Sequence, residues 1–489
     1  MQNLTMLTDL YQLTMTQGYM ENGCQDKMAV FDLFFRTLPQ GSGYAVAAGL
    51  EQVVEYIENL RFSEEDLAYL RSLGIFRESF LQALQDFHFS GDIDAIPEGT
   101  VVFPHEPLVR VKARIFEAQI LETTLLNLVN FETLIATKAS RVVAAAGGGK
   151  VMEFGLRRAQ GPDAGVLGAR AAFVGGCQAT SNVLAGRRFG IPVAGTMAHS
   201  WVQCFPSELE AFRAYARSFP EQCLLLVDTY NVLKSGVPNA IKVGLELEQE
   251  GHHFLGIRID SGDLAYLSRE ARKMLDHAGL TKAIIVGSND LDEETIWAIR
   301  AQGAAIDTWG VGTHLITSKE SPALGGVYKL AAEGDANKLE PRLKVSENIT
   351  KITNPGVKKV VRFYNRDGKA MADLIALEEE NFEQEKELTI FDPLQTWKRK
   401  TLRNFRTREL MVPVFRQGQR VYDLPSLGQI QEYSRQEMST LWDEVKRLTN
   451  PHRYIVDLSL KLFELRQNLL LEVNNKVENN EKGGIKDVE

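Results

Sequence analysis

The chain has 489 residues, of which 44% are hydrophobic and 24% charged, a balance typical of a globular protein with two or three domains. Lys and Arg number 55 against 64 Asp and Glu, so the net charge is −9. This charge argues against a general nucleic-acid or anionic-membrane binder, but it is compatible with a local basic pocket for phosphates. The N-terminus has no signal-peptide pattern, no apolar run has membrane-spanning length, and the four cysteines form no CxxC pair. We therefore expect a reduced, cytoplasmic protein without a zinc site, a nucleic-acid partner or a membrane partner.

The first 139 residues mix helices with a small sheet. Segments with helical apolar spacing are 7–15, 51–60, 62–88 and 121–139. Residues 28–35 have the composition of a strand, and prolines and glycines divide 91–119 into short runs typical of antiparallel strands. We predict an N-terminal α+β domain over 1–139.

Short apolar runs that end in small or acidic residues alternate with helical segments from about residue 140 to 330. These runs are 171–175, 192–198, 224–228, 255–260, 283–288 and 306–312. Repeated strand–helix units predict a parallel sheet, and six in succession favour an irregular (β/α) barrel over an open sheet. No Gly-x-Gly-x-x-Gly follows these strands, which disfavours a dinucleotide-binding sheet. We predict an α/β, barrel-like catalytic domain over 140–345.

The last third of the chain mixes hairpins and helices. The predicted elements are hairpins over 360–376 and 412–422 and helices over 429–448 and 458–473. We expect residues 346–473 to form an α+β segment that packs on the other domains. Residues 474–489 are rich in Asn, Glu and Lys and are predicted to be a disordered tail.

A single histidine, His199, follows an apolar run that ends in Gly195 and Thr196. Its ordinary pKa near neutrality lets an imidazole carry a proton or accept a group. Taken alone, this pattern fits a structural histidine better than a catalytic one, so the interpretation depends on the other residues at the strand ends.

An arginine and two aspartates stand at the ends of predicted strands, where a parallel barrel has its active site. Arg258 and Asp260 are two residues apart on one strand and therefore share a face. A buried arginine needs an anionic partner, which is either Asp260 or a ligand. Asp228 ends the preceding strand. The two aspartates suit ribose hydroxyls or Mg²⁺ held through water, although Asp228 also fits a helix N-cap.

Two further strand ends suit phosphate or aromatic ligands. Gly310, Gly312 and Thr313 offer backbone N–H groups of the kind that bind phosphate, a weak signal by itself. Phe154 and Arg157 combine a ring with a guanidinium group, which suits a flat anion. Without further context, a surface salt-bridge face is the better interpretation of the arginine.

Four motifs together closely resemble the nicotinate phosphoribosyltransferases, a family of type II phosphoribosyltransferases. They are Leu7-Thr8-Asp9-Leu10-Tyr11-Gln12, Phe154-Gly155-Leu156-Arg157-Arg158-Ala159-Gln160-Gly161, Gly195-Thr196-Met197-Ala198-His199-Ser200 and Arg258-Ile259-Asp260-Ser261-Gly262-Asp263. The resemblance runs from about residue 5 to segment 325–330, and more weakly to about 465. It implies that nicotinate attacks the anomeric carbon of phosphoribosyl pyrophosphate (PRPP), giving nicotinate mononucleotide and pyrophosphate in NAD salvage. It also implies that ATP hydrolysis is coupled through a phosphohistidine, in an enzyme classed as a C–N ligase.

The resemblance assigns roles to individual residues, with ATP as co-substrate and Mg²⁺ as cofactor. The implied catalytic residues are His199, which would be phosphorylated, and Asp228 and Asp260, which would hold the ribose or its Mg²⁺. The implied nicotinate-binding residues are Tyr11, Phe154, Arg157, Thr196 and Arg258. The implied PRPP-binding residues are Gly310, Gly312 and Thr313. In this family the tyrosine reaches across a subunit interface, so a homodimer with a shared active site is implied.

Two alternatives remain. The nicotinamide phosphoribosyltransferases are similar, but their resemblance places an aspartate near 180–182, where this chain has Ser181 and Asn182; this favours a carboxylate substrate. The other alternative is a non-catalytic scaffold derived from a barrel. Such a scaffold would not be expected to retain four residues together, namely His199, Arg258, Asp260 and Asp228.

Overall fold

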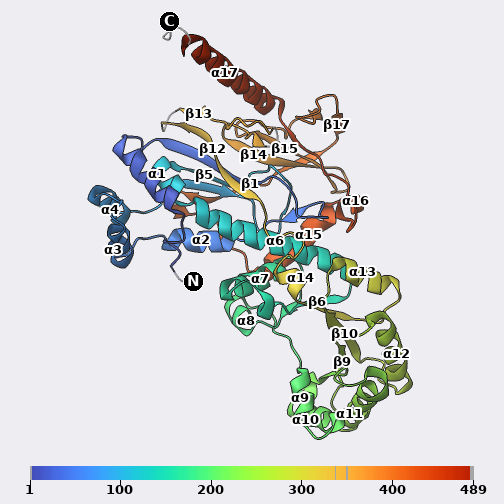
Figure 1. Ribbon diagram of the computed structural model, residues 1–489. Helices are drawn as coiled ribbons and strands as arrows, with labels where there is room; N and C mark the ends of the chain where they lie inside the picture. Colours follow the sequence, from blue (N-terminus) through green and yellow to red (C-terminus); the bar gives the residue numbers. More distant parts are fainter. Residues whose placement is uncertain (1–2, 336–337, 349–350, 485–489) are drawn as a thin grey trace. The chain divides into compact units, whose positions relative to one another are not determined.

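The structure is a computed structural model that describes residues 3–335, 338–348 and 351–484 (Figure 1). The chain forms two compact units. The first comprises Met1–Thr133, Ala323–Ser426 and Tyr433–Glu489, and the second comprises Leu134–Pro322 and Leu427–Glu432. The N-terminal and C-terminal segments thus form the first unit, and the middle of the chain forms most of the second. The two units contain different sheets. Within the described ranges, no helix combines the length and apolarity that a membrane span requires.

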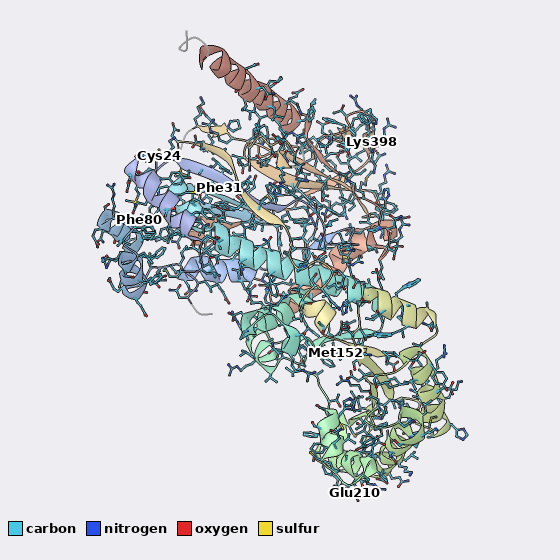
Figure 2. The ribbon with its side chains drawn as sticks, in the orientation of Figure 1. Cys24, Phe31, Phe80, Met152, Glu210 and Lys398 are labelled. Atoms are coloured by element: carbon cyan, nitrogen blue, oxygen red, sulfur yellow. The ribbon has the colours of Figure 1, made fainter. Side chains whose placement is uncertain are left out.

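The first unit is organised around strand β1 (Met28–Phe35), which has the bounds predicted from the sequence. Every residue of β1 after Met28 is buried, which explains why the strand is apolar almost throughout. It lies between β5 (Val109–Arg114) and β12 (Gly326–Gly334), antiparallel to both. Phe31, labelled in Figure 2, stacks on Tyr328 of β12 with ring centroids 4.7 Å apart. Segments distant in the sequence therefore share one core.

Within the described residues, the first unit contains four sheets. The seven-stranded sheet has the order β13-β12-β1-β5-β3-β19-β20, and smaller sheets have the orders β18-β14-β15-β21, β16-β17 and β2-β4. The remaining strands are β2 (Ala45–Val46), β3 (Asp92–Ala95), β4 (Val101–Val102), β13 (Leu339–Pro341), β14 (Lys358–Tyr364), β15 (Ala370–Leu377), β16 (Glu387–Phe391), β17 (Arg399–Arg403), β18 (Arg406–Glu409), β19 (Val412–Arg416), β20 (Gln419–Arg420) and β21 (Val456–Leu458). Both predicted hairpins, β14–β15 and β19–β20, are present.

The helices of this unit are mostly short. They are α1 (Leu10–Glu21), α2 (Leu50–Asn59), α3 (Glu64–Ser72), α4 (Glu78–Gln85), α5 (Ile115–Ile120), α16 (Asp443–Lys446) and α17 (Leu460–Gly484). Two helices cross the unit boundary, namely α6 (Glu122–Ala146) and α15 (Leu427–Thr440). The sequence predicts a disordered tail from Asn474, whereas α17 continues to Gly484; Glu and Lys are good helix formers. Residues 485–489 of that tail lie outside the described residues.

Buried ion pairs join the sheets of the first unit. Asp32 on β1 lies 2.7 Å from Nζ of Lys358 on β14, and both side chains are buried. Arg110 on β5 donates to Asp94 on β3 at 2.8 Å and to the carbonyl of Lys358 at 2.7 Å. A buried charge that lost its partner would be strongly destabilising, so these pairs fix how β14 lies against the larger sheet.

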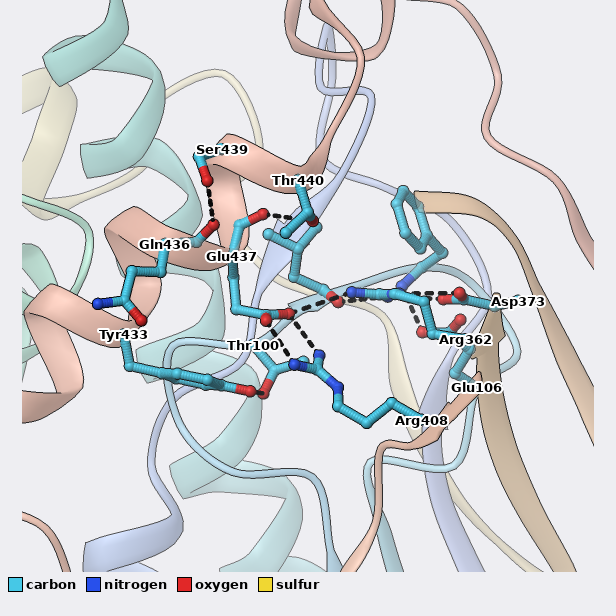
Figure 3. A network of polar contacts seen from close by, with 12 residues as sticks. Thr100, Glu106, Arg362, Asp373, Arg408, Tyr433, Gln436, Glu437, Ser439 and Thr440 are labelled. Atoms are coloured by element: carbon cyan, nitrogen blue, oxygen red, sulfur yellow. Dashed lines mark hydrogen bonds and ion pairs between the residues drawn. The ribbon is translucent and has the colours of Figure 1, made fainter. Parts of the chain in front are cut away.

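A second buried network centres on Arg362 of β14 (Figure 3). Its guanidinium group pairs bidentately with Asp373 of β15, at 2.8 and 2.6 Å. Glu437 of α15 bridges Arg362 and Arg408 of β18, as Figure 3 shows. Burial and the neighbouring Asp373 carboxylate raise the pKa of Glu106 well above its usual range. Bidentate charge-assisted bonds have specific geometry, so the network orients the second half of α15 on this sheet.

The second unit contains six parallel strands in the order β7-β6-β11-β10-β9-β8. They are β6 (Lys150–Glu153), β7 (Ala179–Thr180), β8 (Leu224–Leu226), β9 (Gly256–Ile259), β10 (Ile284–Asn289) and β11 (Thr308–Val311). The predicted class, an α/β fold with parallel strands plus an α+β part, is confirmed. Among the described residues β7 and β8 are the sheet edges, so the irregular barrel is an open half-barrel. Met152 of β6, labelled in Figure 2, marks this sheet.

Two of the six predicted strands are wrong. Residues 171–175 lie at the end of α7 (Pro162–Val174), a helix buried on most of its surface, whose continuous apolar run resembles a buried strand. Residues 192–198 make only one bridge, between Thr180 and Val193. The strands that take their place in the sheet are β6 and β7, which do not form continuous apolar runs: β6 begins and ends with a charged residue, and β7 has two residues.

Helices follow the strands of the second unit. They are α8 (Val183–Phe189), α9 (His199–Gln203), α10 (Glu208–Ser218), α11 (Val237–Gln249), α12 (Leu264–His277), α13 (Glu293–Ala301) and α14 (Thr313–Ile316), with short turns η1 (Leu156–Arg158), η2 (Pro220–Gln222) and η3 (Val232–Gly236). Figure 1 shows α11 and α12 beside β9 and β10. Asp263 and Asp292 cap α12 and α13, and both aspartates accept a backbone N–H.

Candidate active site

Parallel strands bring their carboxyl ends to one edge of the sheet, and most of the predicted site residues of the second unit lie at or just after that edge. Phe154 follows β6, Asp228 follows β8, and Asp260 follows β9. Ser288 lies near the end of β10, and Gly310 lies on β11.

Arg258 is held in one orientation by two neighbours. Its Nη2 lies 2.8 Å from Oδ1 of Asp260, and its Nε donates to Oγ of Ser288 at 2.7 Å. The Ser288 hydroxyl in turn donates to the same Asp260 oxygen. The Arg258 side chain is 17% exposed and that of Asp260 is 32% exposed. The sequence left open whether the anionic partner of Arg258 is Asp260 or a ligand, and in the structure it is Asp260. The Arg258 side chain nevertheless remains partly exposed. Ser288 was not predicted, because a serine at a strand end matches no motif.

An aromatic ring lies next to this arginine. Cζ of Arg258 is 5.7 Å from the centroid of the Phe154 ring, within cation–π range. Gly310 also lies against the ring: a Cβ there would lie 2.7 Å from Cδ2 of Phe154. Gly310 is thus explained by the ring that packs on it. A ring and a cation side by side are suited to a flat anionic ligand.

The turn that carries Phe154 is fixed by a buried carboxylate, Glu153, which the sequence did not indicate. Glu153 accepts hydrogen bonds from the backbone N–H of Gly155 and from the hydroxyl of Thr180. Burial raises the pKa of Glu153 above its usual value. A Cβ at Gly155 would lie 2.5 Å from Cβ of Ile316. The backbone after β6 is therefore tightly determined, and so is the starting point of the Phe154 side chain.

Asp228 does not cap a helix. Its Oδ2 accepts from the Ser261 hydroxyl at 2.6 Å and from the Asp260 N–H at 3.2 Å. Its Oδ1 is buried and has no hydrogen-bond partner among the described residues. The helical turn η3 is capped by Asn231 instead, whose Oδ1 accepts the Lys234 N–H. An unpaired buried carboxylate oxygen is costly, so it points to a group that the site receives from outside.

His199 is the first residue of α9 and lies beside the end of β8. Its Nδ1 is 3.1 Å from Oγ1 of Thr229, the residue after Asp228. Nε2 has no hydrogen-bond partner in the part of the chain that the structure describes. Thr196 lies in the loop before α9, where its hydroxyl donates to the Leu224 carbonyl at 2.6 Å. The structure therefore joins His199 to the Asp228 strand end, and it ties Thr196 to the first residue of β8.

Family models cover most of the chain. Those described as the N-terminal domain, the family and the C-terminal domain of nicotinate phosphoribosyltransferase match residues 6–130, 149–340 and 357–466. This chain belongs to the nicotinate phosphoribosyltransferase family. The Bacillus subtilis nicotinate phosphoribosyltransferase is 47% identical over 477 residues, which cover 97% of each chain. The Homo sapiens protein of that name is 36% identical, over 95% of this chain and 96% of its own.

Two solved structures have the same fold. The crystal structure of human nicotinic acid phosphoribosyltransferase superposes with a TM-score of 0.83 at 34% identity, over 95% of this chain and 100% of that chain. A nicotinate-nucleotide pyrophosphorylase from Pyrococcus furiosus, 22% identical with a TM-score of 0.69, shares the fold.

Asn182, one of the two residues on which the expectation of a carboxylate substrate rests, has a structural role. Asn182 is buried and caps α8, because its Oδ1 accepts the Ala185 N–H at 3.1 Å. Its Nδ2 donates to the Gly165 carbonyl at 3.0 Å. Both ends of the amide are thus occupied by backbone groups, and the side chain presents no carboxylate.

Among the described residues, the other residues assigned from the nicotinate phosphoribosyltransferase family form no hydrogen bond with Arg258, although a Cβ at Gly312 would lie 3.4 Å from the carbonyl oxygen of Phe154. Gly312 precedes α14, and Thr313 is its first residue. Arg157 lies exposed in η1. Tyr11 lies on α1 in the first unit and is 46% exposed. Partial burial and the nearby Glu122 carboxylate raise the pKa of Tyr11 to about 12, so it is a neutral phenol near pH 7.

One cluster with metal-ligand character was not predicted. The ligand atoms of Asp292, His314 and Glu320 lie within 4.8 Å of one another, and His314 Nδ1 is 2.7 Å from Glu320 Oε1. Lys138 of α6 pairs with the other oxygen of Glu320, and Lys319 Nζ lies 3.3 Å from His314 Nε2. Two ammonium groups already face the ligand atoms, so the cluster is a set of ion pairs that fastens α14 to α6.

Proposed function

We propose that this protein is an ATP-dependent nicotinate phosphoribosyltransferase that forms nicotinate mononucleotide and pyrophosphate from nicotinate and PRPP, in NAD salvage. The observation that carries the proposal is the orientation of Arg258 by Asp260 and Ser288 beside the Phe154 ring. Guanidinium and carboxylate form strong charge-assisted hydrogen bonds, and a pyridine ring can stack on a phenyl ring. The Arg258 guanidinium group therefore matches the carboxylate of nicotinate, and the Phe154 ring matches its pyridine ring.

The carboxylates fit the ribose side of this reaction. Bond exchange at the anomeric carbon develops positive charge on the sugar, which negative groups nearby stabilise. Asp228 offers its unpaired, buried Oδ1, and the Asp260 backbone and the Ser261 hydroxyl hold the carboxylate in place. The pyridine nitrogen of nicotinate attacks with its own lone pair, so no base has to remove a proton from it.

Asp228 and Asp260 are also the residues that would hold Mg²⁺. This ion usually binds one or two carboxylates together with substrate phosphates and water, and a two-carboxylate donor set fits that habit. The unpaired Oδ1 of Asp228 is consistent with such a ligand. When bound, Mg²⁺ supplies positive charge that neutralises the leaving pyrophosphate. Gly310, Gly312 and Thr313 would contact the 5′-phosphate.

His199 is proposed as the residue that ATP phosphorylates. Thr229 holds Nδ1, which leaves Nε2 as the ring nitrogen without a partner among the described residues. A neutral imidazole nitrogen attacks the γ-phosphorus, and ADP leaves; water later releases inorganic phosphate. The charge of the phosphohistidine can then bias nearby loops and affinities without taking part at the sugar.

A homodimer with a shared active site would place Tyr11 opposite Phe154 on the nicotinate ring. Four apolar side chains near the start of the chain support an interface there, because each is at least 40% exposed: Leu7, Leu10, Tyr11 and Met15. Thr196 and Arg157 complete the proposed nicotinate contacts. The four free cysteines are consistent with a reducing, cytoplasmic setting.

Two alternative functions, a nicotinamide-specific enzyme and a non-catalytic scaffold, fit the site less well. A nicotinamide-specific enzyme would present a carboxylate to the amide, but Asn182 and Ser181 provide none. A non-catalytic scaffold would have no use for a solvent-accessible arginine held by two side chains.

Radiolabelled nicotinate tests the proposal. With PRPP, ATP and Mg²⁺, the protein should convert it to labelled nicotinate mononucleotide, and omission of PRPP should abolish the product. Omission of ATP should leave a slower reaction driven by pyrophosphate release. γ-Labelled ATP should give an acid-labile, base-stable label that is absent from His199→Asn. No product in the complete mixture would refute the transferase, and a label that persists in His199→Asn would refute the role of His199.

A further inference from the structure

A cavity of about 340 Å³ lies wholly within the first unit. Its walls are largely apolar, and they include the rings of Phe103 and Tyr454, which stack on each other with centroids 4.0 Å apart. Leu394 and Leu38 lie on the same lining. The volume is in the range of pockets that hold a small organic molecule, and such pockets combine apolar walls with a few placed polar groups.

Arg466 of α17 lines this cavity and has no carboxylate partner among the described residues. Its Nη1 donates to the Asn354 side-chain oxygen at 3.1 Å, and its Nε is buried with no hydrogen-bond partner in the same part of the chain. The side chain as a whole is half-buried, and its Cζ lies 5.8 Å from the centroid of the Phe463 ring. Burial lowers the pKa of Arg466. Arg110 and Arg362, which are buried in this unit, each pair with two carboxylates. Arg466 has no such anion, and a buried N–H group without a partner is costly, so Arg466 is suited to bind an anion from outside.

The lining carries one further cation and one acidic residue. Arg453 lies exposed on the lining. Burial lowers the pKa of His105, which also lines the cavity, and the positive charges of Arg466 and Arg453 add to the effect. Asp392 is the acidic residue on the lining, and its Oδ1 accepts the N–H groups of Leu394 and Gln395. One oxygen of that carboxylate is therefore committed to its own turn.

We propose that this cavity binds a small carboxylate with a flat apolar body, the carboxylate on Arg466 and the body against Phe103 and Tyr454. A guanidinium group pairs bidentately with a carboxylate, and aromatic walls accept a planar group. The lining of this site shares no residue with the strand ends of the second unit, and the inference goes beyond the proposed function.

The test uses 4-fluorobenzoate, with neutral 4-fluorobenzamide as the matched probe, followed by fluorine NMR. Because benzoate resembles nicotinate, the full-length protein first carries Arg258→Gln, which weakens the proposed nicotinate site. This variant should still bind fluorobenzoate and should bind fluorobenzamide far more weakly. Addition of Arg466→Gln should weaken fluorobenzoate binding by about tenfold or more, because the charge-assisted bond is lost. Addition of Lys461→Gln, which removes a charge from an exposed position on the same helix, should leave binding unchanged.

A cavity-filling variant guards against misfolding of the Arg466 variant. Leu394→Trp in the Arg258→Gln background leaves Arg466 intact and should also remove binding, because the indole occupies the cavity. The proposal is overturned if the Arg258→Gln protein does not bind fluorobenzoate, if Arg466→Gln and Leu394→Trp leave binding unchanged, or if fluorobenzamide binds equally well. Failure of nicotinate turnover in the unmodified protein would bear on the catalytic site and leave this result unaffected.

Discussion

Arg258 and Asp260 hold each other at 2.8 Å across one face of β9, while the same guanidinium group lies 5.7 Å from the Phe154 ring. A second anchor, Ser288, accepts from Nε at 2.7 Å. The arginine therefore meets a ligand already oriented, and little side-chain entropy remains to be lost on binding. The first two predictions follow from this arrangement.

Replacement of Arg258 by Gln should remove the preference for a carboxylate. We expect the fall in kcat/KM for nicotinate to correspond to a loss of about 2–5 kcal/mol of transition-state stabilisation. This is the usual cost of truncating one partner of a desolvated charge pair. Turnover of nicotinamide should change much less, because a carboxamide does not need the positive charge. Steady-state kinetics with both bases measure the ratio. An equal loss for both bases would mean that Arg258 only supports the fold.

Gly310→Ala should displace the Phe154 ring, because the new Cβ would lie 2.7 Å from Cδ2. We expect overpacking to cost about 1–3 kcal/mol of stability and KM for nicotinate to rise. Gly428→Ala is the matched control: nothing lies within 4 Å of its added Cβ, and a helical glycine gains stability as alanine. If Gly310→Ala behaves like Gly428→Ala in nicotinate kinetics and in urea unfolding, the contact between ring and glycine is unimportant.

A shared active site predicts complementation between two inactive chains. Tyr11→Ala and His199→Ala should each be severely impaired as homodimers. In a heterodimer, one site receives Tyr11 from the His199→Ala chain and His199 from the Tyr11→Ala chain, so it is intact. Mixing the two proteins under conditions of subunit exchange should therefore restore activity. If heterodimers form and remain inactive, Tyr11 acts within its own subunit.

His105 makes the stability of the first unit depend on pH. Burial lowers the pKa of His105 to about 4, and the positive charges of Arg36, Arg466 and Arg453 add to the effect. The unfolded chain binds a proton below about pH 6.5 and the folded chain does not, so stability falls as the pH drops from 6.5 towards 4. His105 has a φ of 72°, which Asn tolerates, so His105→Asn removes the titration without added strain.

The free energy of unfolding of the two proteins at pH 7 and pH 5 measures this effect. From pH 7 to pH 5, the free energy of unfolding of the unmodified protein should fall by about 2 kcal/mol more than that of His105→Asn, as the shifted pKa implies. Burial raises the pKa of Asp457 to about 6, which acts in the opposite direction but equally in both proteins. An identical loss in both would show that His105 titrates normally in the folded state.

Four strands of the parallel sheet could be predicted from apolar runs that end in a small or acidic residue. They are β8, β9, β10 and β11, and β1 of the other unit was predicted to the residue. The pattern failed at 171–175, because a helix covered by neighbours is as apolar as a strand. Strand β6 begins with Lys150 and ends with Glu153, and β7 has two residues, so neither forms a continuous apolar run and tertiary pairing determines them.

The site was predictable where a charged residue stood at a strand end, as with Arg258 and Asp228. Ser288 and Glu153 were not predicted, because the contacts of each depend on which strands are neighbours in the sheet. Ser288 reaches Asp260 only because β10 pairs with β9, and Glu153 reaches Thr180 only because β6 pairs with β7. The order of residues along the chain does not show which strands pair in the sheet.

The proposed site transfers a phosphoribosyl group to a pyridine carboxylate. A competition assay supplies equal concentrations of nicotinate and nicotinamide with PRPP, ATP and Mg²⁺, and mass spectrometry separates the products. We expect nicotinate mononucleotide in large excess, with pyrophosphate in equal amount. Nicotinamide mononucleotide in comparable or greater amount, or no mononucleotide at all, would contradict the proposed transfer.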